Sequence, residues 1–387
     1  MYLAERSWMT EEHEVLRDTV EKFIVAQITP YYEEWEAAGI VPREVWEKLG
    51  SCGLLSPDIP ERYGGAGGSF THLAVILNEF ARHGYAVFAG SMLGVHSGIA
   101  NHYILNHGSK EQKQRYLPSM ASGETVTAIA MTEPAAGSDL QGVQTVAERE
   151  GNGYIINGAK TFISNGQNCD TVIVVAKTDR SVAGSRGISL LMVDANSDGF
   201  TRGRNLEKIG LHCADTSELF FDNVRVEGDA LLGTEHGGFS VLMNELPRER
   251  LTLAIGSLGA IEGALNWTVE YIRERQAFGQ ALSSFQNTRF KVAEMMTEAR
   301  ALRSFIDDCI ASLSVGALDS ATASMAKLKS TEAQGEIVDS CLQLFGGYGY
   351  MREFPISRAF VDARVQRIYG GTSEIMKEII ARDLLGR

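Results

Sequence analysis

The sequence contains few cysteines and none of the spacings that mark a disulfide framework or a metal centre. Its five cysteines, at positions 52, 169, 213, 309 and 341, are odd in number and include no CxxC pair, which predicts reduced thiols. Its eight histidines form no HExxH pattern or comparable ligand spacing. We therefore expect neither a disulfide-stapled fold nor a bound metal ion.

Excess positive charge and long apolar segments are also missing. Lys and Arg number 36 against 49 Asp and Glu, and the formal charge of −13 argues against general binding of nucleic acid. No apolar run approaches the roughly 18 residues that a membrane span requires. The first residues, MYLAERSWMTEEHE, have neither the charge pattern of a secretory signal nor the composition of a transit peptide. These features predict a cytoplasmic protein with no membrane span.

The chain has 387 residues, 44% of them apolar, which is enough for two or three packed units of an ordinary globular protein. Helical signals dominate residues 1–123. Thr10 can cap one helix, and Ser109 with Gln112 forms a capping box before another. The face after Thr10 is apolar at helical spacing, with Val15, Leu16, Val20, Phe23 and Ile24.

Short β-rich runs follow between residues 124 and 233, separated by Gly, Asn and Asp turns. Their spacing, without long helices between them, predicts an antiparallel barrel or sandwich. Helical periodicity returns at about residue 234 and predicts a bundle. The predicted class is α+β, mostly α, with an N-terminal helical domain (1–123), a middle antiparallel β domain (124–233) and a C-terminal four-helix bundle (234–387).

Three motifs place small residues beside polar or aromatic side chains. They are AIAMTEPAAGSD at 128–139, AKTFISNG at 159–166 and QRIYGGTSEIMKE at 366–378. Small residues let the backbone approach a bound group, and Thr132, Phe162 and Ser164 could contact a ring. Taken alone, the first motif could equally be a capped turn.

These motifs occur in a fixed order with RERQAFGQ, QLFGGYGY and ELPRERL. In these motifs and in their order along the chain, the sequence resembles the acyl-CoA dehydrogenase family over nearly its whole length, and it looks most like the long-chain branch. The resemblance implies FAD-dependent α,β-dehydrogenation of an acyl-CoA thioester to the trans-2-enoyl-CoA. It also implies electron transfer to an electron-transferring flavoprotein and a homotetramer built as a dimer of dimers.

The resemblance also assigns the cofactor residues. FAD would lie between the β domain and the C-terminal bundle, with its ring and ribityl chain near Ile129, Met131, Thr132, Gly137, Ser138, Phe162 and Ser164. Thr372 and Glu374 would contact it from the other side. Residues at the ends of bundle helices would hold the pyrophosphate and adenosine across a subunit contact: Arg275, Phe278, Gln286, Gln343, Leu344, Gly346 and Gly347. Without the resemblance, Gly346 or Gly347 would be interpreted as a helix C-cap and Arg275 as a solvated side chain.

One position departs from the family pattern. Most members carry a catalytic carboxylate directly after the tyrosine of the tail motif, where this sequence has Gly370 after Tyr369. The long-chain and isovaleryl branches place the base on an earlier helix, and Glu249 in ELPRERL matches that position. Glu245 is the competitor one turn earlier, and the alternative role for Glu249 is a surface glutamate paired with Arg248.

The substrate is expected to contact residues of AIAMTEPAAGSD, ELPRERL and the tail motif: Ser138, Leu246, Arg250, Tyr369, Gly370 and Gly371. Small residues between 89 and 98 would leave depth for a long or branched acyl chain, although they could also serve close helix packing. The alternatives are an isovaleryl- or terpenoid-type enzyme, an acyl-CoA oxidase or flavin monooxygenase on the same fold, and a non-enzymatic scaffold.

Overall fold

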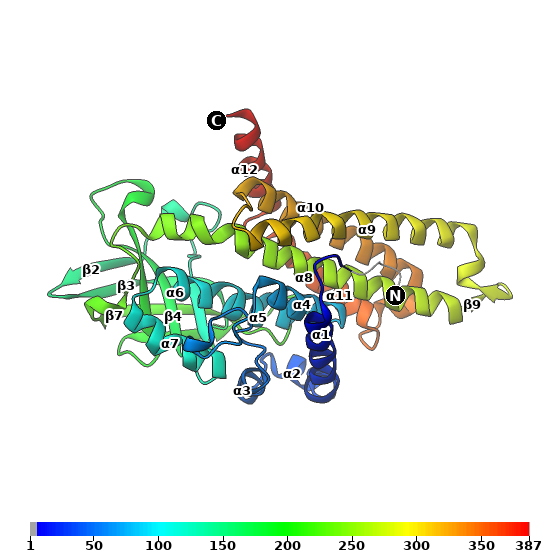
Figure 1. Cartoon of the computed structure of the whole chain (residues 1–387), viewed down its shortest axis with the longest axis horizontal. Helices are drawn as coiled ribbons and strands as arrows, with labels where there is room; N and C mark the ends of the chain where they lie inside the picture. The colour runs from blue at the N-terminus through cyan, green and yellow to red at the C-terminus, as the bar shows by residue number, and fades with distance from the viewer. Residues whose placement is uncertain (1–5, 387) are drawn as a thin grey trace.

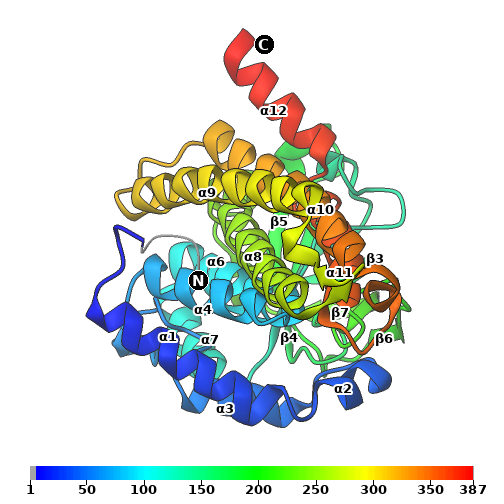
Figure 2. The same cartoon turned by 90° about the vertical axis from the view of Figure 1, so that its right-hand side faces the viewer.

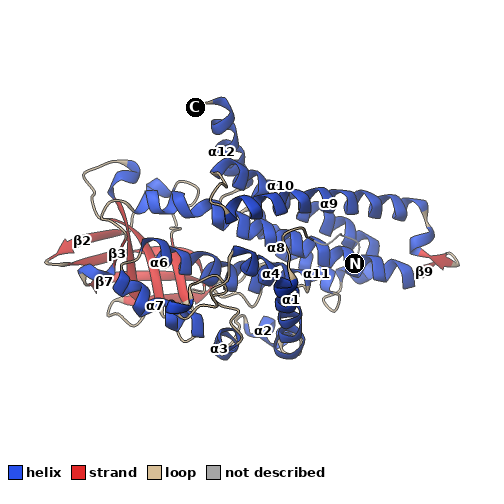
Figure 3. Cartoon of the chain, viewed as in Figure 1, coloured by secondary structure: helices blue, strands red, loops and turns tan. Residues whose placement is uncertain are grey.

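A computed structural model describes residues 6–386. Helices extend to Ser122, strands occupy the region from Thr127 to Leu232, and helices return at Gly238 (Figure 3). In Figure 1 the sheet lies at one end of the molecule, and the long helices run from it toward the other end. This order confirms the predicted class, mostly α with a β domain between two helical parts.

The N-terminal part is built from short helices. They are α1 (Glu11–Phe23), α2 (Tyr32–Ala38), α3 (Arg43–Ser51), α4 (Phe70–Arg82), α5 (Leu93–Val95), α6 (Asn101–His107) and α7 (Lys110–Ser122), with π-helical turns at Phe88–Met92 and His96–Ala100 around α5. The predicted caps are present, because Thr10 and Ser109 each form a capping box. The apolar stripe of α1 is narrower than predicted, since Val15 is 62% exposed while Val20 is fully buried.

The middle part contains a sheet with the order β6-β7-β3-β2-β4-β5-β8, and β1 pairs with β4 outside that path. Its strands are β1 (Thr127–Ala130), β2 (Val146–Glu150), β3 (Gly153–Ser164), β4 (Thr171–Lys177), β5 (Ile188–Asp194), β6 (Phe200–Asn205), β7 (Thr216–Val226) and β8 (Leu231–Leu232). Most pairings are antiparallel as predicted, but β4 runs parallel to both β1 and β2.

Strand β4 explains how this sheet joins the helices. Val172 and Val174 face the core within the β domain, whereas Ile173 and Val175 face a second core that also contains Tyr103 and residues of α7. Because both faces of β4 are covered, its sequence is a continuous apolar run, TVIVVA, and does not alternate between apolar and polar residues. Helix α6 is therefore fixed against the sheet.

The C-terminal part consists of α8 (Gly238–Glu274), a small hairpin of β9 (Gln276–Ala277) and β10 (Gln280–Ala281), and the helices α9 (Gln286–Ser314), α10 (Ser320–Phe345), α11 (Pro355–Ala363) and α12 (Ser373–Leu385). Helix α8 packs against α4, α9 and α10 (Figure 2), which explains why every residue from Leu251 to Leu265 is buried. Helix α12 projects away from the body. No helix in the described residues combines the length and apolar composition needed to cross a bilayer.

Candidate active site

The centre of the candidate site is Glu249, on the part of α8 that faces α6. Its side chain is nearly enclosed, with the residue 5% exposed, and Oε1 accepts a hydrogen bond of 2.7 Å from the Tyr103 hydroxyl. Burial, with a smaller contribution from the charge of Glu245, raises the pKa of the Glu249 carboxyl to about 7. The Tyr103 hydrogen bond and the charge of Arg250 act in the opposite direction. A carboxyl group with this pKa can release and take up a proton at neutral pH.

Glu245, the competing carboxylate, lies one turn earlier and is also buried. Its Oε1 accepts a hydrogen bond of 2.9 Å from Asn106 Nδ2 and lies 2.8 Å from His107 Nε2. Two polar groups of α6 therefore hold Glu245 in place, whereas Glu249 has one hydrogen-bond partner among the described residues. This difference favours Glu249 as the group that reacts.

Arg248 does not pair with Glu249, so the interpretation of Glu249 as half of a surface ion pair is wrong. Arg248 Nη2 lies 2.5 Å from Asp58 Oδ2, and its guanidinium carbon lies 4.7 Å from the centre of the Phe70 ring. Asp58 also pairs with His102 at 3.2 Å. Arg248 thus connects α8 to the N-terminal part of the chain, and the hydrogen-bond partner of Glu249 is Tyr103.

The tail loop that contains Gly370 lies against the same face of α8. A methyl group added at Gly370 would approach Leu253 Cδ1 to 2.4 Å, and Leu253 is one turn after Glu249. Gly370 has φ +62°, a conformation that side chains disfavour. We expected empty space here. The structure instead shows that Leu253 occupies part of the position a side chain at 370 would need. The adjacent Tyr369 hydroxyl lies beside Gly90 of the 88–92 turn.

A buried lysine fixes this loop. Lys327 of α10 is fully buried, and its Nζ donates a 2.6 Å hydrogen bond to the carbonyl oxygen of Gly371. Burial, together with the nearby positive charge of Arg250, lowers the pKa of Lys327 to about 8. Nothing in the sequence indicates this role for Lys327, because a lone lysine in an apolar helix forms no motif.

Arg250, predicted as a substrate contact, is directed toward α10. Its Nη1 donates hydrogen bonds of 2.9 and 3.1 Å to the hydroxyls of Ser320 and Ser324. Its Nε is buried and has no hydrogen-bond partner among the described residues. Of the other predicted substrate residues, Leu246 is half-buried on α8 and Ser138 is exposed in the loop after β1. Leu246 and Arg250 thus lie on α8 itself, and the tail loop packs against the same helix where Gly370 meets Leu253.

The cofactor residues predicted in the β domain lie on two adjoining segments. Ile129 belongs to β1, and Met131, Thr132, Gly137 and Ser138 follow it. Phe162 and Ser164 end β3, and the Thr161 N–H donates a 2.9 Å hydrogen bond to Thr132 O, which joins the two segments. Phe162 is 67% exposed and has φ +58°. An aromatic ring held outward on a strained backbone is suited to cover a planar ligand.

A buried ion pair, which was not predicted from the sequence, lies beneath these segments. Lys160 Nζ lies 2.7 Å from Glu133 Oε1 and donates a 3.1 Å hydrogen bond to Met131 O. Glu133 in turn accepts from the backbone N–H groups of residues 144 and 145. Both charged residues sit inside the quoted motifs, but nothing in their spacing indicates that they pair with each other.

The second predicted cofactor set lies at the opposite end of the molecule. Arg275 follows α8, Phe278 is in the β9–β10 hairpin, and Gln286 begins α9. Near them are Gln343 and Leu344 at the end of α10, followed by Gly346 and Gly347. Gly346, with φ +59°, caps α10, as the turn interpretation expected. Arg275 is not merely solvated, because its guanidinium lies 5.4 Å from the Tyr348 ring centre.

Helix α8 separates the two sets. It has 37 residues, a length of about 55 Å, and its first residues contact β5 of the sheet. Figure 1 shows the sheet and the β9 hairpin at opposite ends of the molecule. The set around Phe278, which is 97% exposed, therefore cannot reach a ligand bound at Phe162 of the same chain.

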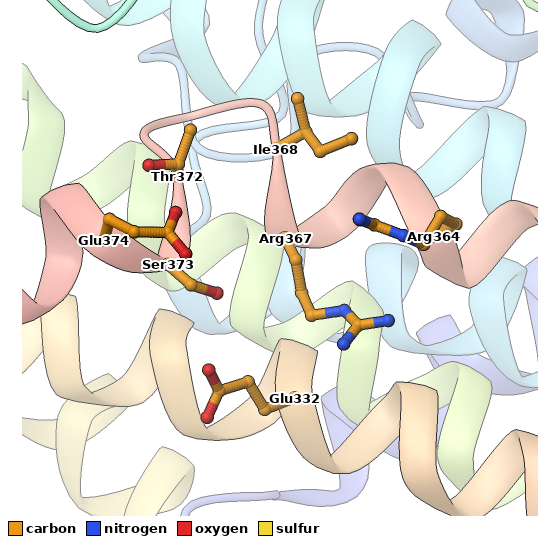
Figure 4. A pocket seen from close by; sticks show the side chains of 7 residues that line it. All are labelled: Glu332, Arg364, Arg367, Ile368, Thr372, Ser373 and Glu374. Carbon is orange, nitrogen blue, oxygen red and sulfur yellow. The ribbon is translucent and has the colours of Figure 1, made fainter.

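Thr372 and Glu374, the remaining cofactor candidates, line a cavity of about 220 Å³ at the start of α12 (Figure 4). Its other lining residues are Glu332, Arg364, Arg367, Ile368 and Ser373. The Thr372 hydroxyl caps α12 by accepting from the Ile375 N–H at 3.3 Å. The hydroxyl of Ser373 is buried and has no hydrogen-bond partner in residues 6–386. The cavity combines two arginines and two glutamates with a helix N-terminus and the unpartnered Ser373 hydroxyl.

Comparison with known proteins gives matches along the whole chain. The N-terminal, middle and C-terminal domain models of acyl-CoA dehydrogenase match residues 10–124, 128–224 and 236–385. The mitochondrial long-chain specific acyl-CoA dehydrogenase of Rattus norvegicus is 47% identical over 381 residues, which is 98% of this chain and 88% of that protein.

Solved structures agree. The crystal structure of an acyl-CoA dehydrogenase from Geobacillus kaustophilus superposes with a TM-score of 0.95 at 44% identity, covering 98% of this chain and all of that one. A glutaryl-CoA dehydrogenase from Mycobacterium smegmatis, solved in complex with FADH2, has a TM-score of 0.90 at 29% identity, covering 98% and 96% of the two chains.

Proposed function

The chain belongs to the acyl-CoA dehydrogenase family, and we propose that it converts a long-chain or branched acyl-CoA into the trans-2-enoyl-CoA with FAD as cofactor. It is an oxidoreductase of acyl-CoA thioesters, as its family and relatives establish. The observation that carries the finer proposal is the enclosed Glu249 carboxyl, with a pKa of about 7, beside the tail loop.

In this reaction a proton leaves the α carbon and a hydride leaves the β carbon of the acyl group. FAD, when bound, supplies the acceptor for the hydride. Glu249 is the proposed base for the α proton. The N–H of Gly370 is the proposed donor to the thioester oxygen, which would make the α proton more acidic. Lys327 supports this arrangement by tying the loop to α10 at the Gly371 carbonyl, and Leu253 of α8 packs against Gly370.

The exposed Phe162 ring, the Thr132 and Ser164 hydroxyls and the open surface at Gly137 fit a flavin at the end of β3. Thr372, Glu374 and the arginines of the cavity at α12 would supply hydrogen-bond donors and acceptors on the helical side. The separate set around Arg275 and Phe278 supports an assembly in which one subunit completes the cofactor site of another. We propose a homotetramer that delivers its electrons to an electron-transferring flavoprotein in the cytoplasm.

The proposal is tested by anaerobic mixing of the purified yellow protein with straight-chain and branched acyl-CoAs. Loss of the flavin absorbance should be fastest with long or branched chains, and the product should be the 2-enoyl-CoA. Rapid reoxidation of the reduced protein by air would instead indicate an oxidase. A purified protein without flavin would contradict the proposal.

A further inference from the structure

Helix α6 presents three polar side chains to α8. Tyr103 and His107 are four residues apart, and Asn106 lies between them on the same helical face. On α8, Glu249 and Glu245 have the same four-residue spacing. Tyr103 contacts Glu249, while Asn106 and His107 contact Glu245. Each carboxylate thus has its own partner, and the partner of Glu249 is a tyrosine.

The Tyr103 hydroxyl has little freedom to move. The residue is fully buried, and its ring belongs to the core formed by α6, α7, the sheet and the first turn of α8. Burial and the charge of Glu249 raise the pKa of Tyr103 well above its usual value, so the phenol keeps its proton and acts as the donor. The 2.7 Å contact is therefore a hydrogen bond from a fixed neutral donor to a carboxylate in a dry environment.

This bond acts on the reactive carboxyl group in two ways. It favours the ionised form, which is the form that can accept a proton from substrate. It also engages Oε1, so the orientation of the carboxylate is fixed and Oε2 is left for the substrate. A packing role alone would need the ring but not the hydroxyl.

We propose that Tyr103 is a positioning residue for proton abstraction, and that its hydroxyl keeps the Glu249 carboxylate ionised and oriented toward the α carbon of the acyl group. The inference rests on the proposed function, in which Glu249 is the base. Tyr103 acts through Glu249. The other charged groups that influence Glu249 are Glu245 and Arg250, both on α8.

The test separates proton removal from oxidation. The flavin-loaded protein is incubated in D2O with 3,3-dimethylbutanoyl-CoA, whose β carbon carries no hydrogen, so no hydride can leave. The base breaks the α C–H bond, and a deuteron from solvent replaces the proton. Mass spectrometry of the thioester then reports the exchange rate as a function of pH without any change in the flavin.

In Tyr103→Phe, loss of a bond to the ionised carboxylate should move the midpoint of the exchange profile to higher pH by about one to two pH units. Near pH 6 the exchange should therefore slow by about tenfold or more. Tyr116→Phe is the matched control. It removes the same atom from a half-buried tyrosine of α7 whose charged neighbours are Arg115, Asp194 and Asp229, and its profile should equal that of the wild type.

An unchanged midpoint in Tyr103→Phe overturns the proposal, even if the rate falls equally at every pH, because that result indicates packing alone. If this variant does not fold, 3-fluorotyrosine at position 103 replaces it, since a more acidic phenol should move the midpoint to lower pH. Glu249→Gln separates the two levels of inference. Normal exchange in Glu249→Gln refutes the base itself, whereas lost exchange in Glu249→Gln with an unmoved Tyr103→Phe midpoint refutes only the role of Tyr103.

Discussion

Replacing Glu249 with glutamine should stabilise the folded chain at neutral and alkaline pH while it removes activity. The wild-type carboxyl has a usual pKa of 4.5 and a folded-state pKa of about 7, because burial penalises its charge. Between these pH values the folded chain holds a proton that the unfolded chain has released. The wild type therefore loses stability as pH rises through this window, and the full cost is present above pH 7.

The two pKa values set the size of the effect. They differ by about 2.5, which corresponds to about 3 kcal/mol at 1.36 kcal/mol for each pH unit. Glutamine resembles the protonated acid in shape, and its amide oxygen can still accept from Tyr103. The advantage of Glu249→Gln over the wild type should be small near pH 5 and should approach 3 kcal/mol, roughly several degrees in Tm, above pH 7.

Thermal unfolding of both proteins between pH 5 and 8.5, at equal flavin content, measures this difference. Glu245→Gln is the matched control, because its carboxylate already has Asn106 and His107 as partners, so its gain should be limited to the smaller effect of removing a charge near Glu249. If the Tm difference between Glu249→Gln and the wild type does not grow with pH, the carboxyl is not held in the dry environment that the account requires.

Two further predictions concern the tail loop. Gly370→Ala should destabilise the protein by about 2 kcal/mol, because residue 370 has a positive φ and the added methyl group would clash with Leu253. In thermal unfolding, the double variant Gly370→Ala/Leu253→Ala should lose less stability than the sum of the two single variants. Additive losses would mean that the two residues do not touch. Lys327→Met should slow flavin reduction by about tenfold or more, because it releases the Gly371 carbonyl. Lys329→Met, which removes an exposed lysine from the same helix, should leave the rate unchanged. Equal rates in the two variants would show that Lys327 does not position the loop.

Much of the architecture could be predicted because its signals are local. The predicted cap at Thr10 and the predicted capping box of Ser109 with Gln112 each depend on neighbouring residues, and both are present. The change from helical to β-rich texture after residue 123 also follows from short-range pattern. The parallel pairing of β4 with β1 and β2 could not be predicted in this way, because strand direction depends on how the chain returns to the sheet.

The candidate base is an intermediate case. Glu249 could be identified because the absence of a carboxylate at Gly370 directed attention to a second known position. Its hydrogen-bond partner could not be identified from the sequence, since Tyr103 lies 146 residues away and forms part of no motif. The pairs Asp58–Arg248 and Glu133–Lys160 were missed for the same reason. The prediction of space at Gly370 failed because the reach of the Leu253 side chain depends on the packing of α8 against the loop.

The central claim is that Glu249, and not Glu245, takes the α proton. The most direct measurement is the single-turnover rate of flavin reduction by a reactive acyl-CoA under anaerobic conditions, compared between Glu249→Gln and Glu245→Gln. The account predicts a loss of several orders of magnitude in Glu249→Gln, with flavin and ligand still bound, and a loss of less than about tenfold in Glu245→Gln. A near-normal rate in Glu249→Gln would contradict it.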